Sequence, residues 1–399
     1  MKKLIINAKI INEKNKLTSV HMLVEEGKIS KIYDNNIKIE DILSVYNPNV
    51  IDANNNLILP GFINSNASLL KKFFYEKNNF NDYNDFIEKF ENFKQNLTEE
   101  EKYLIYKFEI LNSIKNGITT ICDEDFYNLS LKKAVLETKI RPVYKVGINN
   151  CFENINEILI KKLNQQNTNV ILALNSVLFN NEDNFSKMIS LSKIYDRPIF
   201  CNSSFSLFEA GEVDTSFNSS TINLLNNYGF LDYDNILFSA NVLDKEDYNI
   251  LKHSDINLLF SPSFNLSFGY PNANIYALNQ NNKIGLSSFK NDYFLEMFLL
   301  KNLENNNYDK LNLFDYFDIF KMTTKNNAEI IKQNLIGEIK EGNFADLVIY
   351  DIKYLTKENQ ILQNLNSANI ISSFINGEEV YNKNIELFNT ELINKINKI

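Results

Sequence analysis

Histidine is scarce in this sequence: only His21 and His253 occur among 399 residues. Neutral imidazole is the commonest protein ligand for zinc and iron, so a site built on three or more histidines is excluded by count. His21 falls in a run near the N-terminus that predicts a strand. His253 follows a short helical pattern, where an imidazolium suits the C-terminal end of the helix dipole. We predict a surface or capping role for both side chains.

Cysteine is almost as scarce. Cys122, Cys151 and Cys201 are an odd number without C-x-x-C spacing, which argues against a disulfide framework and against a thiolate zinc site. A catalytic cysteine needs a neighbouring base, and no histidine lies near any of the three in sequence. The prediction is three buried thiols near strand ends.

The chain also lacks clustered positive charge and long apolar stretches. Its 41 Lys and Arg residues are outnumbered by 50 Asp and Glu residues, giving a net charge of −9 without any basic run, so a nucleic-acid partner is disfavoured. No stretch approaches the roughly 18 apolar residues of a membrane span. The N-terminal apolar run turns polar at Asn7, too early for a signal-peptide core. We expect no membrane partner and a cytoplasmic location.

Short apolar runs separated by helical segments occupy the middle of the chain. Eight such runs predict an α/β fold, a (β/α)₈ TIM barrel. The runs cover residues 57–63, 118–122, 142–148, 169–174, 198–201, 235–239, 256–260 and 283–286. One intervening helix begins with a capping box, in which Thr98 is the cap and Glu101 follows three residues later.

Both ends of the chain are rich in short β runs instead, at residues 3–11, 20–25 and 29–33 before the barrel and at 345–351 and 370–375 after it. We predict that the two ends combine into a small composite β-sandwich domain. The predicted division is residues 1–56 and 335–384 for the two parts of the sandwich, 57–334 for the barrel and 385–399 for a C-terminal helix.

Five segments resemble, in the right order, motifs of the amidohydrolase superfamily. Residues 60–68 resemble its Pro-Gly-Phe-x-x-x-His-x-His motif at barrel strand 1. Residues 339–351 resemble its Gly-x-x-Ala-Asp-Leu-Val return into the sandwich, and 374–381 its terminal hairpin. Residues 109–123 and 261–269 resemble the aminohydrolase and chlorohydrolase branch, which includes guanine deaminase-like enzymes. The resemblance implies the fold of this superfamily over nearly the whole chain.

The same resemblance implies where the family's metal ligands would stand, and this chain has other residues there. The positions correspond to a His-x-His pair, a His-x-x-Glu pair after strand 5, a histidine after strand 6 and an aspartate after strand 8. They hold Asn66, Ser68, Asn202, Phe205, Ala240 and Phe289. Because the ligands and the proton-shuttling glutamate are missing together, the family's metal-activated water cannot form. We predict no metal and no other cofactor.

Phe289 carries a geometric prediction. It follows strand 8, so its ring should point into the barrel mouth and fill the space that metal and water occupy in the family. Asn66, Ser68 and Asn202 would then hydrogen-bond to one another or to trapped water.

The sequence also allows a different site at the same barrel mouth. Asp123 and Asp125 close strand 2, and alternate residues of a strand point the same way, as a hard-cation site requires. The alternative is a solvated loop that caps the next helix. Ser261 and Asn265 follow strand 7 and complete a candidate pocket, but the sequence identifies no base for a serine nucleophile.

Three functional hypotheses remain. The first is a degenerate amidohydrolase-family protein without the metal site, which binds a small molecule or pairs with an active paralogue or with itself as a homo-oligomer. The second is a hydrolase acting on the non-peptide carbon–nitrogen bonds of a small cyclic or amine substrate through an unorthodox site. The third is a structural subunit without any ligand pocket.

Overall fold

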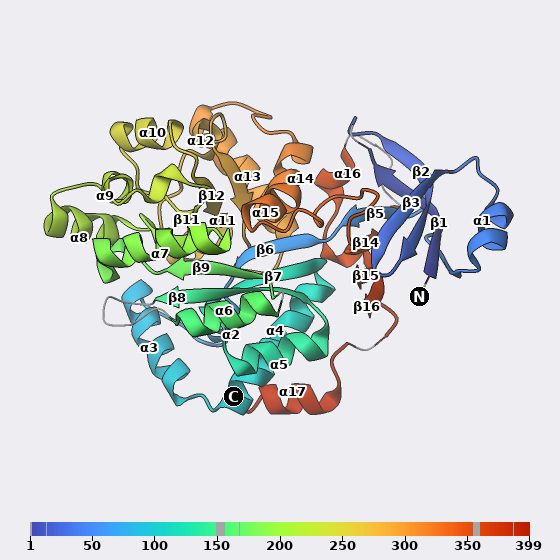
Figure 1. The fold of residues 1–399 in the computed structure, drawn as a ribbon, viewed down its shortest axis with the longest axis horizontal. Helices are drawn as coiled ribbons and strands as arrows, with labels where there is room; N and C mark the ends of the chain where they lie inside the picture. Colours follow the sequence, from blue (N-terminus) through green and yellow to red (C-terminus); the bar gives the residue numbers. More distant parts are fainter. Residues whose placement is uncertain (1, 13, 149–155, 167, 354–359, 386) are drawn as a thin grey trace.

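The structure is a computed structural model that describes residues 2–12, 14–148, 156–166, 168–353, 360–385 and 387–399. Two sheets organise these residues, one built from both ends of the chain and one from its middle (Figure 1). In Figure 1 the first sheet, drawn in blue and red, lies to one side of the barrel.

The sheet built from both chain ends confirms that the termini combine into one small β unit. It is a single mixed sheet of eight strands in the order β16-β15-β14-β5-β1-β2-β3, with β4 paired to β1. Its strands are β1 (Lys2–Ile11), β2 (Leu17–Glu25), β3 (Lys28–Asp34), β4 (Asn49–Asp52), β5 (Leu57–Pro60), β14 (Leu347–Tyr350), β15 (Ile370–Ile375) and β16 (Glu378–Asn382).

The predicted TIM barrel is confirmed. Eight strands follow one another in sequence order, and every neighbouring pair is parallel. They are β6 (Phe62–Ala67), β7 (Ile118–Phe126), β8 (Arg141–Ile148), β9 (Val170–Leu174), β10 (Ile199–Ser203), β11 (Ile236–Ser239), β12 (Asn257–Phe260) and β13 (Lys283–Leu286). The Asn64 side chain donates to the carbonyl of Ser288 at 2.8 Å and accepts from its N–H at 3.2 Å, joining the two ends of the barrel sheet.

The first predicted barrel run, residues 57–63, is two strands rather than one. Its first part, β5, belongs to the mixed sheet, and only β6 belongs to the barrel. Gly61 lies between them, where a Cβ atom would come within 2.2 Å of the Thr119 side chain. The chain therefore changes sheets at a point where only glycine fits. The predicted domain boundaries remain predictions.

Helices cover the outside of the barrel. They are α2 (Leu69–Lys77), α3 (Tyr83–Asn96), α4 (Glu99–Lys115), α5 (Leu129–Thr138), α6 (Glu157–Gln165), α7 (Glu182–Tyr195), α8 (Leu207–Phe217), α9 (Thr221–Asn227), α10 (Lys245–Lys252), α11 (Pro262–Phe268), α12 (Ile275–Leu278), α13 (Tyr293–Tyr308), α14 (Tyr316–Thr323) and α15 (Lys325–Ile330). Outside this set lie α1 (Ile39–Tyr46), α16 (Ile361–Asn364) and α17 (Thr390–Ile396). The capping box at Thr98 and Glu101 is confirmed at the start of α4.

One buried ion pair joins the barrel to the mixed sheet. Arg141, at the start of β8, donates to both carboxylate oxygens of Asp346, at 2.6 and 2.9 Å. Asp346 also accepts from the backbone N–H of Asn376 at 2.8 Å. The aspartate of the motif at residues 339–351 therefore connects the two sheets.

The two histidines lie away from the barrel mouth. His21 is in β2 and 2% exposed, and its Nδ1 accepts from the N–H of Asn7 at 3.2 Å, so a surface role for it is wrong. Strand β2 has both of its faces covered there, which the sequence does not reveal. His253 does cap α10, as predicted.

The described cysteines, Cys122 and Cys201, are both buried as predicted, on β7 and β10. Cys151 lies outside the described residues. Among the helices in the described ranges, none is long and apolar enough to cross a membrane.

Candidate functional site

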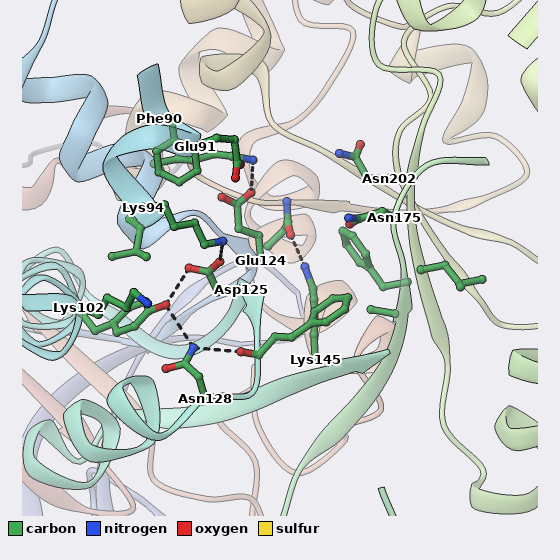
Figure 2. A pocket seen from close by; sticks show the side chains of 18 of the residues that line it. Phe90, Glu91, Lys94, Lys102, Glu124, Asp125, Asn128, Lys145, Asn175 and Asn202 are labelled. Atoms are coloured by element: carbon green, nitrogen blue, oxygen red, sulfur yellow. Dashed lines mark hydrogen bonds and ion pairs between the residues drawn. The ribbon is translucent and has the colours of Figure 1, made fainter. Parts of the chain in front are cut away.

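A cavity of about 530 Å³ opens at the C-terminal ends of the first five barrel strands, β6 to β10. Figure 2 shows its two sides, with Glu91, Lys94, Glu124 and Asp125 on one and Asn175 and Asn202 on the other. Phenylalanine rings also line it. The C-terminal face of a TIM barrel is where enzymes of this fold place their sites, so the cavity is the candidate functional site.

The charged side of the cavity consists of ion pairs. Lys71 on α2 pairs with Glu124 at 3.0 Å, and Lys94 on α3 pairs with Asp125. The Tyr106 hydroxyl donates to Asp125 at 2.8 Å. Burial, together with Asp125, raises the pKa of Tyr106, so this tyrosine stays protonated. Each of these carboxylates is therefore already held by a donor from the surrounding helices.

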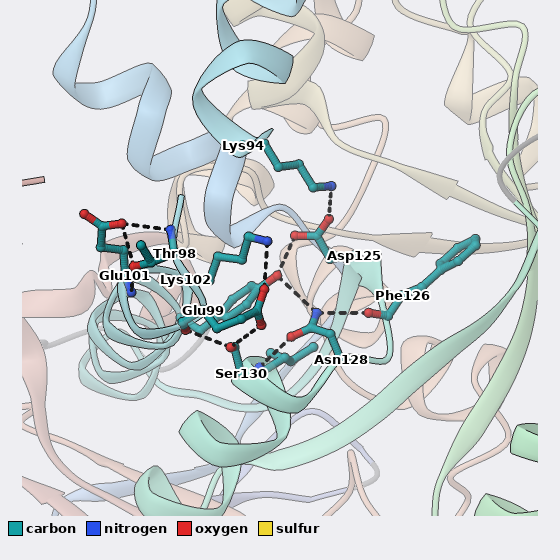
Figure 3. A network of polar contacts seen from close by, with 11 residues as sticks. Lys94, Thr98, Glu99, Glu101, Lys102, Asp125, Phe126, Asn128 and Ser130 are labelled. Carbon is teal, nitrogen blue, oxygen red and sulfur yellow. Dashed lines mark hydrogen bonds and ion pairs between the residues drawn. The ribbon is translucent and has the colours of Figure 1, made fainter. Parts of the chain in front are cut away.

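A second set of contacts fixes the segment after β7 (Figure 3). Asn128 caps α5 by accepting from the N–H of Leu131 at 2.8 Å, and it donates to Tyr106 at 3.3 Å. Ser130 donates to Glu99 at 2.8 Å, and Glu99 pairs with Lys102 at 2.9 Å. These bonds tie the end of β7 to α4, so Asp125 is presented to the cavity from a fixed backbone.

Lys145 lies at the floor of the cavity and was not anticipated from the sequence. It comes from β8, is 1% exposed, and donates to the side-chain oxygen of Asn66 on β6. Its Nζ is 3.5 Å from the centroid of the Phe200 ring. Burial lowers the pKa of this amine against the opposing influence of nearby acidic groups. Val143, two residues earlier, packs inside the barrel, and this alternation could have placed residue 145 on the inner face.

The amide side of the cavity includes an unsatisfied acceptor. The side-chain oxygen of Asn202 on β10 is buried and has no hydrogen-bond partner among the described residues. A buried acceptor without a partner is costly, by about 1–3 kcal/mol. A ligand that donates an N–H or O–H in the cavity would satisfy it.

Aromatic rings fill the other side of the barrel mouth. Phe289 is 3% exposed, and its ring centroid lies 5.4 Å from those of Tyr75 and Phe264 and 5.5 Å from that of Phe268, all edge to face. We call this group the aromatic cluster; it consists of Tyr75, Tyr83, Phe205, Phe264, Phe268, Tyr270 and Phe289. The ring of Phe289 thus lies inside the barrel mouth. The aromatic cluster fills the part of the mouth next to the cavity, which opens over the first five strands.

The six positions implied by the family resemblance have different surroundings. Asn66 and Asn202 line the cavity, whereas Phe205 and Phe289 belong to the aromatic cluster. Ser68 is buried at the start of α2, and Ala240 is buried in a left-handed turn after β11, with φ of 45°. The expected hydrogen bonds among Asn66, Ser68 and Asn202 are not found within the described ranges. Asn66 is bonded to Lys145 instead.

Asp123 and Asp125 lie two residues apart but face different partners. Asp123 is buried and accepts from the backbone N–H groups of Leu69 at 3.0 Å and Asp125 at 3.1 Å, so it holds the start of α2 rather than a solvated loop. Burial raises its pKa. Asp125 alone of the pair lines the cavity, where Lys94 and Tyr106 hold it.

The other two predicted pocket residues lie after β12. Asn265 exchanges hydrogen bonds of 3.0 Å with the Asn241 side chain, and the buried Ser261 hydroxyl has no partner in the described part of the chain. Neither lines the cavity. In the ranges that the structure describes, no three or more His, Cys, Asp or Glu residues are grouped as metal ligands would be.

Sequence relatives point to one family. A sequence model of the amidohydrolase family matches residues 57–380. The chain is 27% identical over 369 residues to a 5'-deoxyadenosine deaminase of Methanococcus aeolicus, covering 86% of this chain and 85% of the relative. It is 25% identical over 393 residues to a 5-methylthioadenosine/S-adenosylhomocysteine deaminase of Caldicellulosiruptor saccharolyticus, covering 93% and 90%.

Solved structures show the same architecture. An adenosine deaminase of Xanthomonas campestris with bound zinc matches with a TM-score of 0.86 at 13% identity, covering 99% of this chain and 97% of that one. A guanine deaminase of C. acetobutylicum with bound guanine matches with a TM-score of 0.77 at 16% identity, covering 96% and 100%. At these identities the likeness shows the fold.

Proposed function

The chain belongs to the amidohydrolase family, and from that premise we propose that its barrel-mouth cavity takes a small nitrogen-containing ring compound of the purine-nucleoside type. The nearly full-length relatives named as deaminases of adenosine compounds support this class of ligand. The cavity has matching chemistry, because Phe90 and Phe200 add apolar surface to a lining that also carries amide and charged groups.

The observation that carries the proposal is the buried side-chain oxygen of Asn202. This oxygen has no partner among the described residues, and Asn202 is one of the residues that line the cavity. An amino group or ring N–H of a purine is a donor of the kind this oxygen lacks. A purine-type ligand would therefore remove the cost of the unsatisfied acceptor when it binds.

The residues at the family's ligand positions do not fit a zinc or iron ion. Ala240 and Phe289 have no donor atom in their side chains, and the oxygen of Asn66 already accepts from Lys145. An amide, a hydroxyl and a lysine amine are a poor set for either metal. The proposed function therefore includes no step through a metal ion.

The first candidate activity is hydrolysis of a carbon–nitrogen bond without a metal. The deaminase relatives favour it, as does the position of Lys145 at the cavity floor. A neutral lysine amine can take a proton from a water molecule as that water attacks the ring carbon, and can return it to the departing nitrogen. Ammonia then leaves, and oxygen takes its place.

The second candidate is binding without turnover. It is favoured by Phe205 and Phe289, which pack in the aromatic cluster. The sequence resemblance matches these two positions to the family's proton-shuttling glutamate and metal-binding aspartate. A protein of this kind would be a receptor or a partner subunit built on an enzyme fold. A homo-oligomer or a complex with an active paralogue would suit that role.

Calorimetric titration with 5'-deoxyadenosine and methylthioadenosine, together with ammonia release from the same mixtures, tests the proposal. Asn202→Leu should weaken binding by about two- to tenfold, the net value of one hydrogen bond. Asn302→Leu, at an exposed position on α13, should leave it unchanged. Ammonia release that is lost in Lys145→Met supports hydrolysis, and binding without release supports the second candidate. Absence of binding to both compounds would refute the purine-type ligand.

A further inference from the structure

Four lysines line the cavity, and one of them differs from the others. Lys71 pairs with Glu124 at 3.0 Å, Lys94 pairs with Asp125, and Lys102 pairs with Glu99 at 2.9 Å. Among the described residues, Lys145 donates its hydrogen bond to a neutral group, the amide oxygen of Asn66. A buried ammonium is normally paired with a carboxylate, so the surroundings of Lys145 suit an uncharged amine better than those of the other three lysines.

Burial and the charged groups around Lys145 together lower the pKa of its amine. Burial is the largest influence on its pKa and lowers it, and Lys71 acts in the same direction. Cys122, Glu124 and Asp123 oppose this. However, Glu124 is held by Lys71, and Asp123 accepts from two backbone N–H groups. The balance of burial and these charges lowers the pKa of Lys145. The Phe200 ring, 3.5 Å from Nζ, acts in the opposite direction, because it favours the charged form.

We propose that Lys145 is a reactive amine, which forms an imine with a small aldehyde or ketone admitted to the barrel-mouth cavity. The amine is buried against Asn66 and Phe200 and still lines the cavity, so a small molecule can reach it. A lysine amine that is desolvated in an apolar pocket is activated as a nucleophile toward carbonyl compounds.

The reaction balances without any further reagent. The nitrogen lone pair of Lys145 attacks the carbonyl carbon, and a proton moves from nitrogen to oxygen, giving a carbinolamine. Loss of the hydroxyl group with the second nitrogen-bound proton releases one water molecule and leaves the carbon–nitrogen double bond. No atom is oxidised or reduced.

Asn202 indicates which class of carbonyl compound would bind beside Lys145. Asn202 lines the same cavity as Lys145, and its unpartnered oxygen is an acceptor for a hydroxyl or amino group on the compound. Hydroxy-aldehydes and hydroxy-ketones carry both functions. The inference rests on the contacts of Lys145 and not on the purine-type ligand, so failure of nucleoside binding leaves it standing.

Reductive trapping tests it. The full chain is incubated at pH 7 with glycolaldehyde and sodium cyanoborohydride, and modification of each lysine is followed by peptide mapping in a mass spectrometer. An exposed lysine of ordinary pKa is uncharged in only about one molecule in 2500 at this pH, and each unit of lowering raises that fraction about tenfold. We expect Lys145 to react at least about tenfold faster than the exposed Lys310.

Asn66→Asp gives the matched control. A carboxylate in place of the amide would favour the ammonium form, so modification of Lys145 should slow by about tenfold or more while Lys310 is unchanged. Near-ultraviolet circular dichroism checks that the variant keeps its tertiary packing. The proposal is overturned if wild-type Lys145 reacts no faster than Lys310, a result that does not depend on the variant. It is also overturned if the folded Asn66→Asp protein keeps the wild-type rate at Lys145.

Discussion

Replacing Phe289 by alanine should destabilise the fold strongly, because its ring is part of the packing of the barrel mouth. The side chain is 3% exposed and meets three rings edge to face, at 5.4 to 5.5 Å between centroids. Phe→Ala changes in cores cost about 3–5 kcal/mol. That range already includes lost aromatic pairs, which are worth about 0.5–1.5 kcal/mol each beyond burial. We therefore expect a loss of about 4 kcal/mol in the free energy of unfolding.

Phe298→Ala is the matched control. Phe298 lies on α13 and is 55% exposed, so its removal should change stability by about 0.5 kcal/mol or less. Urea unfolding of the two variants, followed by circular dichroism under identical conditions, gives the comparison. Two variants within about 1 kcal/mol of each other would refute the idea that Phe289 fills the barrel mouth.

Phe289→Asp should cost more than Phe289→Ala in the same assay. A carboxylate would stand among aromatic rings, where an unpaired charge is expensive. A neighbouring cation is Lys290, whose Nζ is 5.4 Å from the centroid of the Phe289 ring. An aspartate variant as stable as the alanine variant would indicate that Lys290 or solvent reaches the carboxylate.

Three further predictions concern metal, pH and assembly. Protein expressed with added zinc, iron and manganese should carry less than about one tenth of an equivalent of each metal by elemental analysis. The reason is that the chain has only two histidines, one in β2 and one at the end of α10. Burial raises the pKa of Glu296 on α13 to about 7. Because this carboxyl has a higher pKa in the folded than in the unfolded protein, its contribution to stability is complete below pH 4. That contribution falls by roughly 3 kcal/mol as the pH rises to 7. Glu296→Gln should therefore make the melting temperature less dependent on pH between pH 5 and 8. The same change of melting temperature with pH in the variant and the wild type would contradict this. Light scattering at micromolar concentrations should show a homo-oligomer, and a monomer throughout would count against self-association.

The barrel could be predicted because its strands are buried on both faces and appear as short apolar runs between helices. The same property explains the one strand that was misplaced. An apolar run such as residues 57–63 says that a segment is buried but not which sheet buries it, and the change of sheet at Gly61 depends on contact with Thr119. The prediction of a surface role for His21 failed for a similar reason. A strand pattern does not show that an element from elsewhere in the chain covers the second face of the strand.

The candidate site was harder to predict, because it depends on pairs that are distant in sequence. Phe289 could be placed from its offset after strand 8, since one strand sets that direction. The contact between Asn66 and Lys145 joins two strands that are separated by 79 positions, and nothing local to either residue indicates the other. Yet a charged residue that alternates with Val143 on an inward face breaks the apolar pattern of a barrel strand. Burying such a lysine costs stability unless its surroundings compensate for it, so an inward-facing lysine near the C-terminal end of a barrel strand is itself a reason to expect chemistry there.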